Sequence, residues 1–162
     1  MNGRSIAFAV GASSQLVILG DPVIRRLLHY RQKGRGAEEA GGQLFAAFEN
    51  EEINVVSVTG PRKGDQRGRT HFRPDRRAEQ EEIVMHHSMG LHYVGDWHSH
   101  PEERPRPSRT DIASISDCFK RSKHDLAGFL LLIVGQAEPP EGFHLSLHGN
   151  KGMVDLGRGV AR

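Results

Sequence analysis

One stretch of the chain, residues 126–134, constrains the fold more than any other. It is the most apolar run in the 162-residue sequence, and it is short enough to be a strand rather than a buried helix. Strands that are apolar throughout are usually buried on both faces of a sheet. The sequence therefore predicts a central strand here, in a sheet that lies between helices.

The other segments alternate between strand and helix patterns. Apolar residues recur at helical spacing after three capping residues, which predicts helices from Asp21 to about Gly34, from Asp75 to about Met89, and from Ser108 to about Ser122. Strands are expected at residues 5–10, 15–19, 43–48, 53–59, 91–97 and 143–147, the first two as a hairpin, and the Gly-rich C-terminus is expected to fray. We therefore expect one α/β (α+β) domain over residues 1–162, with a mixed β-sheet flanked by helices.

The composition excludes several classes of protein. The single cysteine, Cys118, allows no internal disulfide and no zinc site built on several thiolates, so any metal must be held by nitrogen and oxygen. No run approaches the roughly 18 to 20 apolar residues that span a bilayer, and the N-terminal apolar run is too short for a signal peptide, so a cytoplasmic protein is expected. The net charge of +2 does not by itself indicate nucleic-acid binding. Seven basic residues nevertheless gather between Arg62 and Arg77, in a segment expected to be an extended surface loop.

The residues that point to chemistry follow the strand expected at 91–97. His98 and His100 are two residues apart, so they share one face of an extended chain. The loop that follows is long enough to bring Asp111, in the first turn of the next helix, back over the strand end. Two imidazole nitrogens and one carboxylate oxygen leave a fourth zinc position open for water, as in catalytic zinc sites. Zinc lowers the pKa of such a water to about 7.

Each part of this pattern also has a structural interpretation. A His-x-His pair on a strand is more often a pair of surface polar residues, and Ser108 with Asp111 has the spacing of a helix capping box. The joint pattern is more specific than its parts. Five specified residues at fixed spacing are expected by chance on the order of once in ten thousand such chains.

The pattern resembles the JAMM motif of the JAB/MPN zinc metalloproteases, which stands complete here as His98, His100, Pro101, Ser108 and Asp111. Upstream, the run from Glu39 through Ala40, Gly41, Gly42 and Gln43 to Leu44 is similar to the Glu-x-Gly-Gly-x-Leu of that family, so the resemblance spans about residues 39–134. It implies a JAB/MPN-like, deaminase-like three-layer domain. It also implies Zn²⁺ bound by His98, His100 and Asp111, with Glu39 as general acid and base and Ser108 stabilising the tetrahedral intermediate. Glu38 is the competing candidate base, and the Gly-Gly register favours Glu39.

The resemblance is strongest to short bacterial members that stand beside ubiquitin-like conjugation enzymes, including those of antiviral operons. It implies an isopeptidase that removes a ubiquitin-like modifier from its target or from an activating-enzyme adduct. Two alternatives stay open: a nucleic-acid-associated protein like the RadC branch, and a catalytically silent scaffold of this fold. The basic segment has little aromatic interleaving, so nucleic acid is not the expected partner. That segment is expected either to hold the tail of the substrate or to be a solvated loop, and the sequence indicates no particular substrate-binding residue or oligomeric state.

Overall fold

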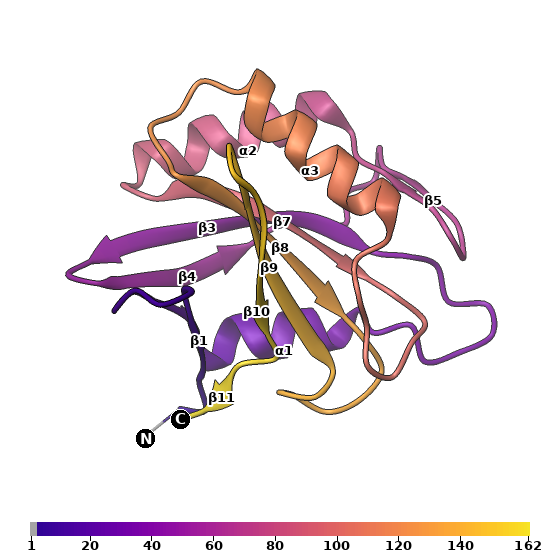
Figure 1. Ribbon diagram of the computed structural model, residues 1–162. Helices are drawn as coiled ribbons and strands as arrows, with labels where there is room; N and C mark the ends of the chain where they lie inside the picture. The colour runs from indigo at the N-terminus through magenta and orange to yellow at the C-terminus, as the bar shows by residue number, and fades with distance from the viewer. Residues whose placement is uncertain (1–2) are drawn as a thin grey trace.

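The computed structural model describes residues 3–162, and its centre is a nine-stranded mixed sheet (Figure 1). In chain order the strands are β1 (Ile6–Ala9), β2 (Leu16–Leu19), β3 (Gly41–Glu49), β4 (Glu52–Val58), β7 (His92–Ser99), β8 (Gly128–Val134), β9 (Phe143–Gly149), β10 (Gly152–Gly157) and β11 (Val160–Ala161). Their order across the sheet is β10-β9-β8-β7-β3-β4-β2-β1-β11. Neighbours are antiparallel except for two parallel pairs, β2 with β4 and β7 with β8. The sheet curls so that β1 also contacts β10.

Three helices cover the two faces of the sheet, which confirms the expected α+β class. Helix α1 (Asp21–His29) lies on one face, while α2 (Arg76–Ser88) and α3 (Arg109–Arg121) lie on the other (Figure 1). The central strand β8 is apolar on both sides for this reason. Leu130, Leu132 and Val134 join the core under α1, and the alternate residues Phe129, Leu131 and Ile133 join the core under α3.

Helices α2 and α3 begin at the capping residues that the sequence predicted, but α1 does not. Asp75 caps α2 by accepting from the backbone N–H groups of the next turn, and Ser108 caps α3. Helix α1 has Gly20 at its N-cap with no side-chain cap. Asp21 lies inside the first turn and pairs with Arg25 at 3.0 Å, so its expected capping role is wrong. The helix ends at His29, ahead of Gly34.

Two further expectations about irregular segments are wrong. The Gly-rich C-terminus does not fray, because β10 pairs with β9 and β11 pairs with β1. The basic segment contains a small hairpin, β5 (Gln66–Arg67) with β6 (Phe72–Arg73), in place of an extended loop. Within the described residues, 3–162, no helix has both the length and the apolar character needed to cross a membrane.

Buried charges fix the segment before this hairpin against α2. Arg62 donates two hydrogen bonds to the Glu82 carboxylate, both 2.7 Å long. The Asp65 carboxylate accepts from the backbone N–H groups of Arg62 and Asp75, at 2.6 and 2.7 Å. Proteins tolerate buried charged groups when these are paired and hydrogen-bonded in this way. The path of residues 60–75 is therefore set by polar contacts with α2 and its cap.

Glu79 on α2 should make stability depend on pH. Burial, together with the negative charge of Asp96, raises the pKa of Glu79 from 4.5 to about 7, although Arg76 and Arg62 oppose this. The folded chain then keeps a proton that the unfolded chain loses near pH 4.5. The free energy of unfolding should therefore fall as pH rises from about 4.5 to 7, by about 3 kcal/mol at most.

Urea unfolding at several pH values, with a chelator present, measures this effect. The Glu79→Gln variant should lack this part of the decline, so the difference between the two chains should grow with pH across that window. Parallel curves for the two chains would contradict the assignment.

Candidate active site

The two histidines lie at the carboxyl end of β7, in the middle of the sheet. His98 pairs with Gly41 of β3 on one side and with Ile133 of β8 on the other. His100 follows the strand, and its N–H donates to the carbonyl of Val134 at 2.9 Å. Both imidazoles are largely buried, with side-chain exposures of 17% and 8%. The two imidazoles thus stand at alternate positions of one extended segment.

Helix α3 brings Asp111 to the same place. In a strand–helix–strand unit with parallel strands, the helix runs back along the sheet, so its first turn lies near the carboxyl end of the first strand. Asp111 Oδ2 lies 3.0 Å from His100 Nε2, and its Oδ1 lies 3.4 Å from His98 Nδ1. The same carboxylate accepts from the backbone N–H of Ser108 at 2.9 Å, while Ser108 Oγ accepts from the Asp111 N–H at 3.0 Å. Asp111 is therefore both the second half of a capping box and the partner of both histidines.

The charges within this cluster support one another. Burial disfavours the ionised form of Asp111, but hydrogen bonds from His100 and His98 outweigh it and hold the pKa of Asp111 well below its usual range. Burial likewise opposes the protonated form of His100, yet the hydrogen bond to Asp111 leaves the pKa of His100 raised. The cluster is thus an ionised carboxylate that attracts positive charge.

Glu39 faces this cluster from the segment before β3. Burial raises the pKa of the Glu39 carboxyl, although the charges of His100 and His98 oppose the rise. Its side chain forms no hydrogen bond or ion pair with any residue in the described range 3–162. Glu38, the competing candidate base, is exposed. Of the two glutamates, Glu39 is the one that the structure brings to the histidines.

Two glycines let the Glu39 segment approach β7 closely. A side chain at Gly41 would collide with the Phe72 ring and the carbonyl of Trp97, and one at Gly42 would overlap the backbone of Thr59. Phe72, from the β5–β6 hairpin, packs edge-on against the His98 ring at 5.4 Å between centroids. The Gly-Gly pair that the sequence singled out therefore has a steric reason.

The candidate donors, two imidazoles and a carboxylate, are of the kind that zinc binds. Two ligands of a tetrahedral zinc with bonds of about 2.0 to 2.1 Å lie about 3.3 Å apart. The nitrogen-to-oxygen distances of 3.0 and 3.4 Å at Asp111 are close to that value. However, each imidazole meets its own carboxylate oxygen, and no group of three or more His, Cys, Asp or Glu side chains within residues 3–162 is arranged around a common point. The three side chains would have to rotate before they could share one ion.

The basic residues between Arg62 and Arg77 are mostly engaged within the protein. Arg62 binds Glu82, and Arg67 Nε donates to the backbone carbonyl of Glu39 at 2.8 Å. Arg76 and Arg77 pair with acidic residues of α2. Three exposed side chains have no ion pair within the described part of the chain: Lys63, Arg69 and Arg73. The free positive charge is therefore smaller than the sequence suggested, and part of it lies on the hairpin beside His98.

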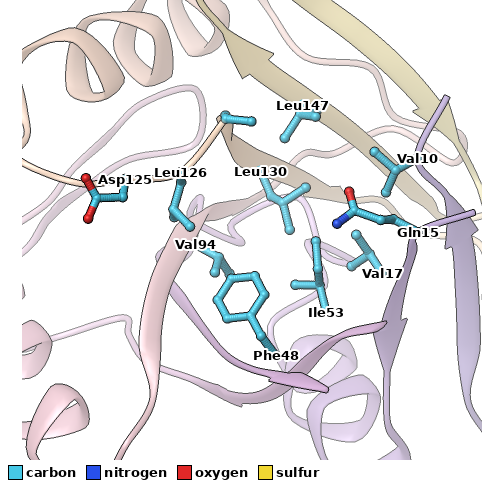
Figure 2. Close-up of a pocket in the computed structure, with 12 residues that line it drawn as sticks. Val10, Gln15, Val17, Phe48, Ile53, Val94, Asp125, Leu126, Leu130 and Leu147 are labelled. Carbon is cyan, nitrogen blue, oxygen red and sulfur yellow. The ribbon is translucent and has the colours of Figure 1, made fainter. Parts of the chain in front are cut away.

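A separate apolar pocket opens at the other end of the sheet (Figure 2). Its volume is about 180 Å³, and its walls include Val17, Ile53 and Leu130, with Phe48 at one side. None of the candidate site residues lines it. Asp125 is the one acidic side chain of its lining, so the pocket offers no second cluster of catalytic groups.

Sequence reasoning missed several residues that support the site. Arg67 and Phe72 lie in the segment expected to be a loop, and neither Ser99 nor Gln32 was singled out. No spacing rule connects these residues, because they meet only through the fold. One signal was available for Ser99. Strand alternation turns its hydroxyl to the face opposite the histidines, and a polar side chain buried on that face needs a hydrogen-bond partner.

The chain is similar in sequence and fold to several known proteins. The profile of a family described as prokaryotic homologs of the JAB domain matches residues 21–147. A Vibrio cholerae protein named CD-NTase/cGAS isopeptidase is 36% identical over 131 residues, which cover 78% of this chain and 80% of that protein. A Sinorhizobium fredii protein named probable metalloprotease y4qB is 34% identical over 79 residues, 45% of this chain and 48% of that one. The solution structure of protein DSY2949 from Desulfitobacterium hafniense matches with a TM-score of 0.57 and 25% identity, covering 81% of this chain and 82% of that one.

The Asp111→Asn variant tests the proposed ligand set. Asparagine keeps an oxygen that can accept from the Ser108 N–H, so α3 stays capped, but it removes the negative charge that attracts a cation. The wild-type chain should carry about one zinc per molecule after dialysis against trace zinc, and the variant less than about a tenth of that, measured by atomic emission. Asp117→Asn, an exposed position on the same helix, is the control and should retain zinc. Full zinc content in Asp111→Asn would exclude Asp111 as a ligand.

Proposed function

The chain belongs to the family of prokaryotic JAB-domain proteins, and from this membership we propose that it is a zinc-dependent isopeptidase that removes a ubiquitin-like modifier from its target. We propose that residues 1–162 form one such catalytic domain. The observation that carries the proposal is the meeting of His98, His100 and Asp111 with a half-buried carboxylate, Glu39, that has no hydrogen-bond partner of its own within residues 3–162. The isopeptidase and metalloprotease names of the relatives support the same reaction class.

In this proposal His98, His100 and Asp111 hold Zn²⁺. When bound, the ion supplies a Lewis acid that polarises the scissile carbonyl and activates a water at neutral pH. Three protein ligands are the number found in catalytic zinc sites, which keep one position open. The capping contacts with Ser108 hold the Asp111 carboxylate in one orientation, which supports a fixed ligand geometry.

Glu39 is assigned the proton transfers. It would take a proton from the attacking water and deliver it to the nitrogen of the leaving amine, so that the amine departs neutral. A general base works best when its pKa lies near the working pH, and burial moves the pKa of Glu39 in that direction. Both backbone groups of Glu39 are hydrogen-bonded, so the free carboxylate extends from a fixed point.

Ser108 is assigned the stabilisation of the oxyanion. Its oxygen accepts the hydrogen bond of the helix cap, which uses a lone pair and leaves the hydroxyl hydrogen free to donate. A hydroxyl donor of this kind stabilises the negative charge that develops on the carbonyl oxygen in the transition state. The capping and catalytic roles of Ser108 are therefore compatible.

The substrate is proposed to be a conjugate between a ubiquitin-like protein and an enzyme of the CD-NTase class, or the adduct of that modifier with its activating enzyme, in antiviral defence. The name of the Vibrio cholerae relative supports the CD-NTase target. The exposed cations Arg69 and Arg73 belong to the hairpin beside His98, and Lys63 precedes it, which suits a modifier that presents acidic groups near its tail.

A cleavage assay with matched glutamate variants tests the proposal. The substrate is a ubiquitin-like protein extended past its C-terminus, and cleavage should stop with a chelator and return with zinc. Glu39→Gln should keep zinc but lose about 100-fold or more in rate, because it removes the proton carrier. Glu38→Gln, its exposed neighbour, should cleave at the wild-type rate. Equal rates for both variants would move the base elsewhere, and no cleavage by the wild type with zinc bound would contradict the isopeptidase function.

Charge reversal on the hairpin tests its contact with substrate. Arg69→Glu should raise KM about fivefold or more at low salt with little change in kcat, because exposed charges steer and hold the partner rather than act in the chemical step. The control is Lys151→Glu, at the exposed turn between β9 and β10. A KM that changes equally in both variants would show that the hairpin charge has no specific role.

A further inference from the structure

A buried carboxamide, that of Gln32, lies behind the candidate active site. Gln32 follows α1 and is 2% exposed. Its Nε2 donates to the backbone carbonyls of Ala37 and Arg69, both at 3.2 Å, and its Oε1 accepts from Ser99 Oγ at 3.1 Å. Both N–H groups and the oxygen of the amide are therefore used. One side chain joins three segments that are far apart in the sequence.

The Ser99 hydroxyl carries this connection into the site. Ser99 stands between the two candidate histidine ligands and is fully buried. Its Oγ accepts from the N–H of Ala40 at 2.8 Å, and its own N–H donates to the carbonyl of Ala40 at 2.8 Å. Ala40 directly follows Glu39. The strand of the ligands and the segment of the base are thus joined through the hydroxyl that Gln32 orients.

The β5–β6 hairpin reaches Glu39 from the other side. The N–H of Glu39 donates to the carbonyl of Gly68 at 2.7 Å, and Arg67 Nε donates to the Glu39 carbonyl at 2.8 Å. Arg69, in the turn of the same hairpin, supplies one of the two carbonyls that Gln32 binds. Both backbone groups of Glu39 are therefore held by a hairpin that Gln32 anchors.

The placement of Glu39 relative to the histidines matters for the proposed catalysis. Catalytic groups must be held within about 0.5 Å of their productive geometry, and a displacement of about 1 Å can cost on the order of 100-fold in rate. A buried network in which every polar group is satisfied is rigid, and its parts move together. We propose that Gln32 and Ser99 are positioning residues that orient the His98–His100 segment and set its separation from Glu39. This inference rests on the proposed function.

A matched pair of serine variants tests the inference. Ser99→Ala removes the hydroxyl that links the two halves of the site. Ser146→Ala, on β9, removes an equally buried hydroxyl that bonds to His148 Nε2 at 2.8 Å, outside the network. We expect Ser99→Ala to lower kcat about tenfold or more with KM within about twofold, and to weaken zinc binding about threefold or more in competition with a chelator. Ser146→Ala should lower the melting temperature by a similar amount and leave kcat, KM and zinc affinity unchanged.

Gln32→Met provides a second, independent variant of nearly the same size. It should repeat the effects of Ser99→Ala, and the Gln32→Met/Ser99→Ala double variant should be little worse than the more damaging single one, because both break the same link. Independent, additive losses would contradict a shared positioning role.

The possible outcomes separate this inference from the proposed function. If Ser99→Ala and Gln32→Met lose only thermal stability and otherwise match Ser146→Ala, the positioning role is wrong while the isopeptidase function stands. If the wild type binds zinc but cleaves no modifier extension, the proposed function is wrong, and weaker zinc binding in the two variants still supports the positioning role. Unchanged zinc binding in that case would overturn the inference as well.

Discussion

The site depends on one carboxylate, that of Asp111. It completes the capping box of α3 and at the same time contacts both imidazoles at the end of β7. The parallel crossover from β7 through α3 to β8 puts the first turn of the helix above the strand end, so the residue that the cap requires is also the one that the histidines meet. A shift of α3 along the sheet would move Asp111 away from both imidazoles, whereas the capping box lies within the start of the helix and would move with it.

The other half of the site comes from close backbone approach. Gly41 and Gly42 let the start of β3 pass between β7, the Phe72 ring and the Thr59 backbone, where a larger residue would collide. Hydrogen bonds then hold both the N–H and the carbonyl of Glu39, and within residues 3–162 its carboxylate has no hydrogen-bond partner. A side chain that must move protons needs this combination, because a carboxylate committed to a structural hydrogen bond is a poorer base.

Local sequence patterns correctly predicted the helices and strands whose ends depend on residues within or next to the element. The caps at Asp75 and Ser108 and the doubly buried strand β8 agree with the structure, since a helix cap and an apolar run depend on neighbours in the sequence. The cap at Asp21 and the frayed C-terminus are wrong for a different reason. The N-cap of α1 is Gly20, one residue before Asp21. The C-terminal strands are ordered because they pair with β9 and β1, and pairing between distant strands cannot be deduced from a local pattern.

The sequence by itself indicated the candidate set of His98, His100, Ser108 and Asp111, because strand alternation puts the two histidines on one face and helix capping puts Ser108 and Asp111 at one helix start, and both rules are local. Only the tertiary structure decided which groups face that set. These groups are Glu39, the hairpin with Arg67 and Phe72, and the buried amide of Gln32, and their segments meet only in the folded chain. Contacts between distant segments depend on sheet order and register, and these are chosen by the packing of the whole core rather than by any one stretch of chain.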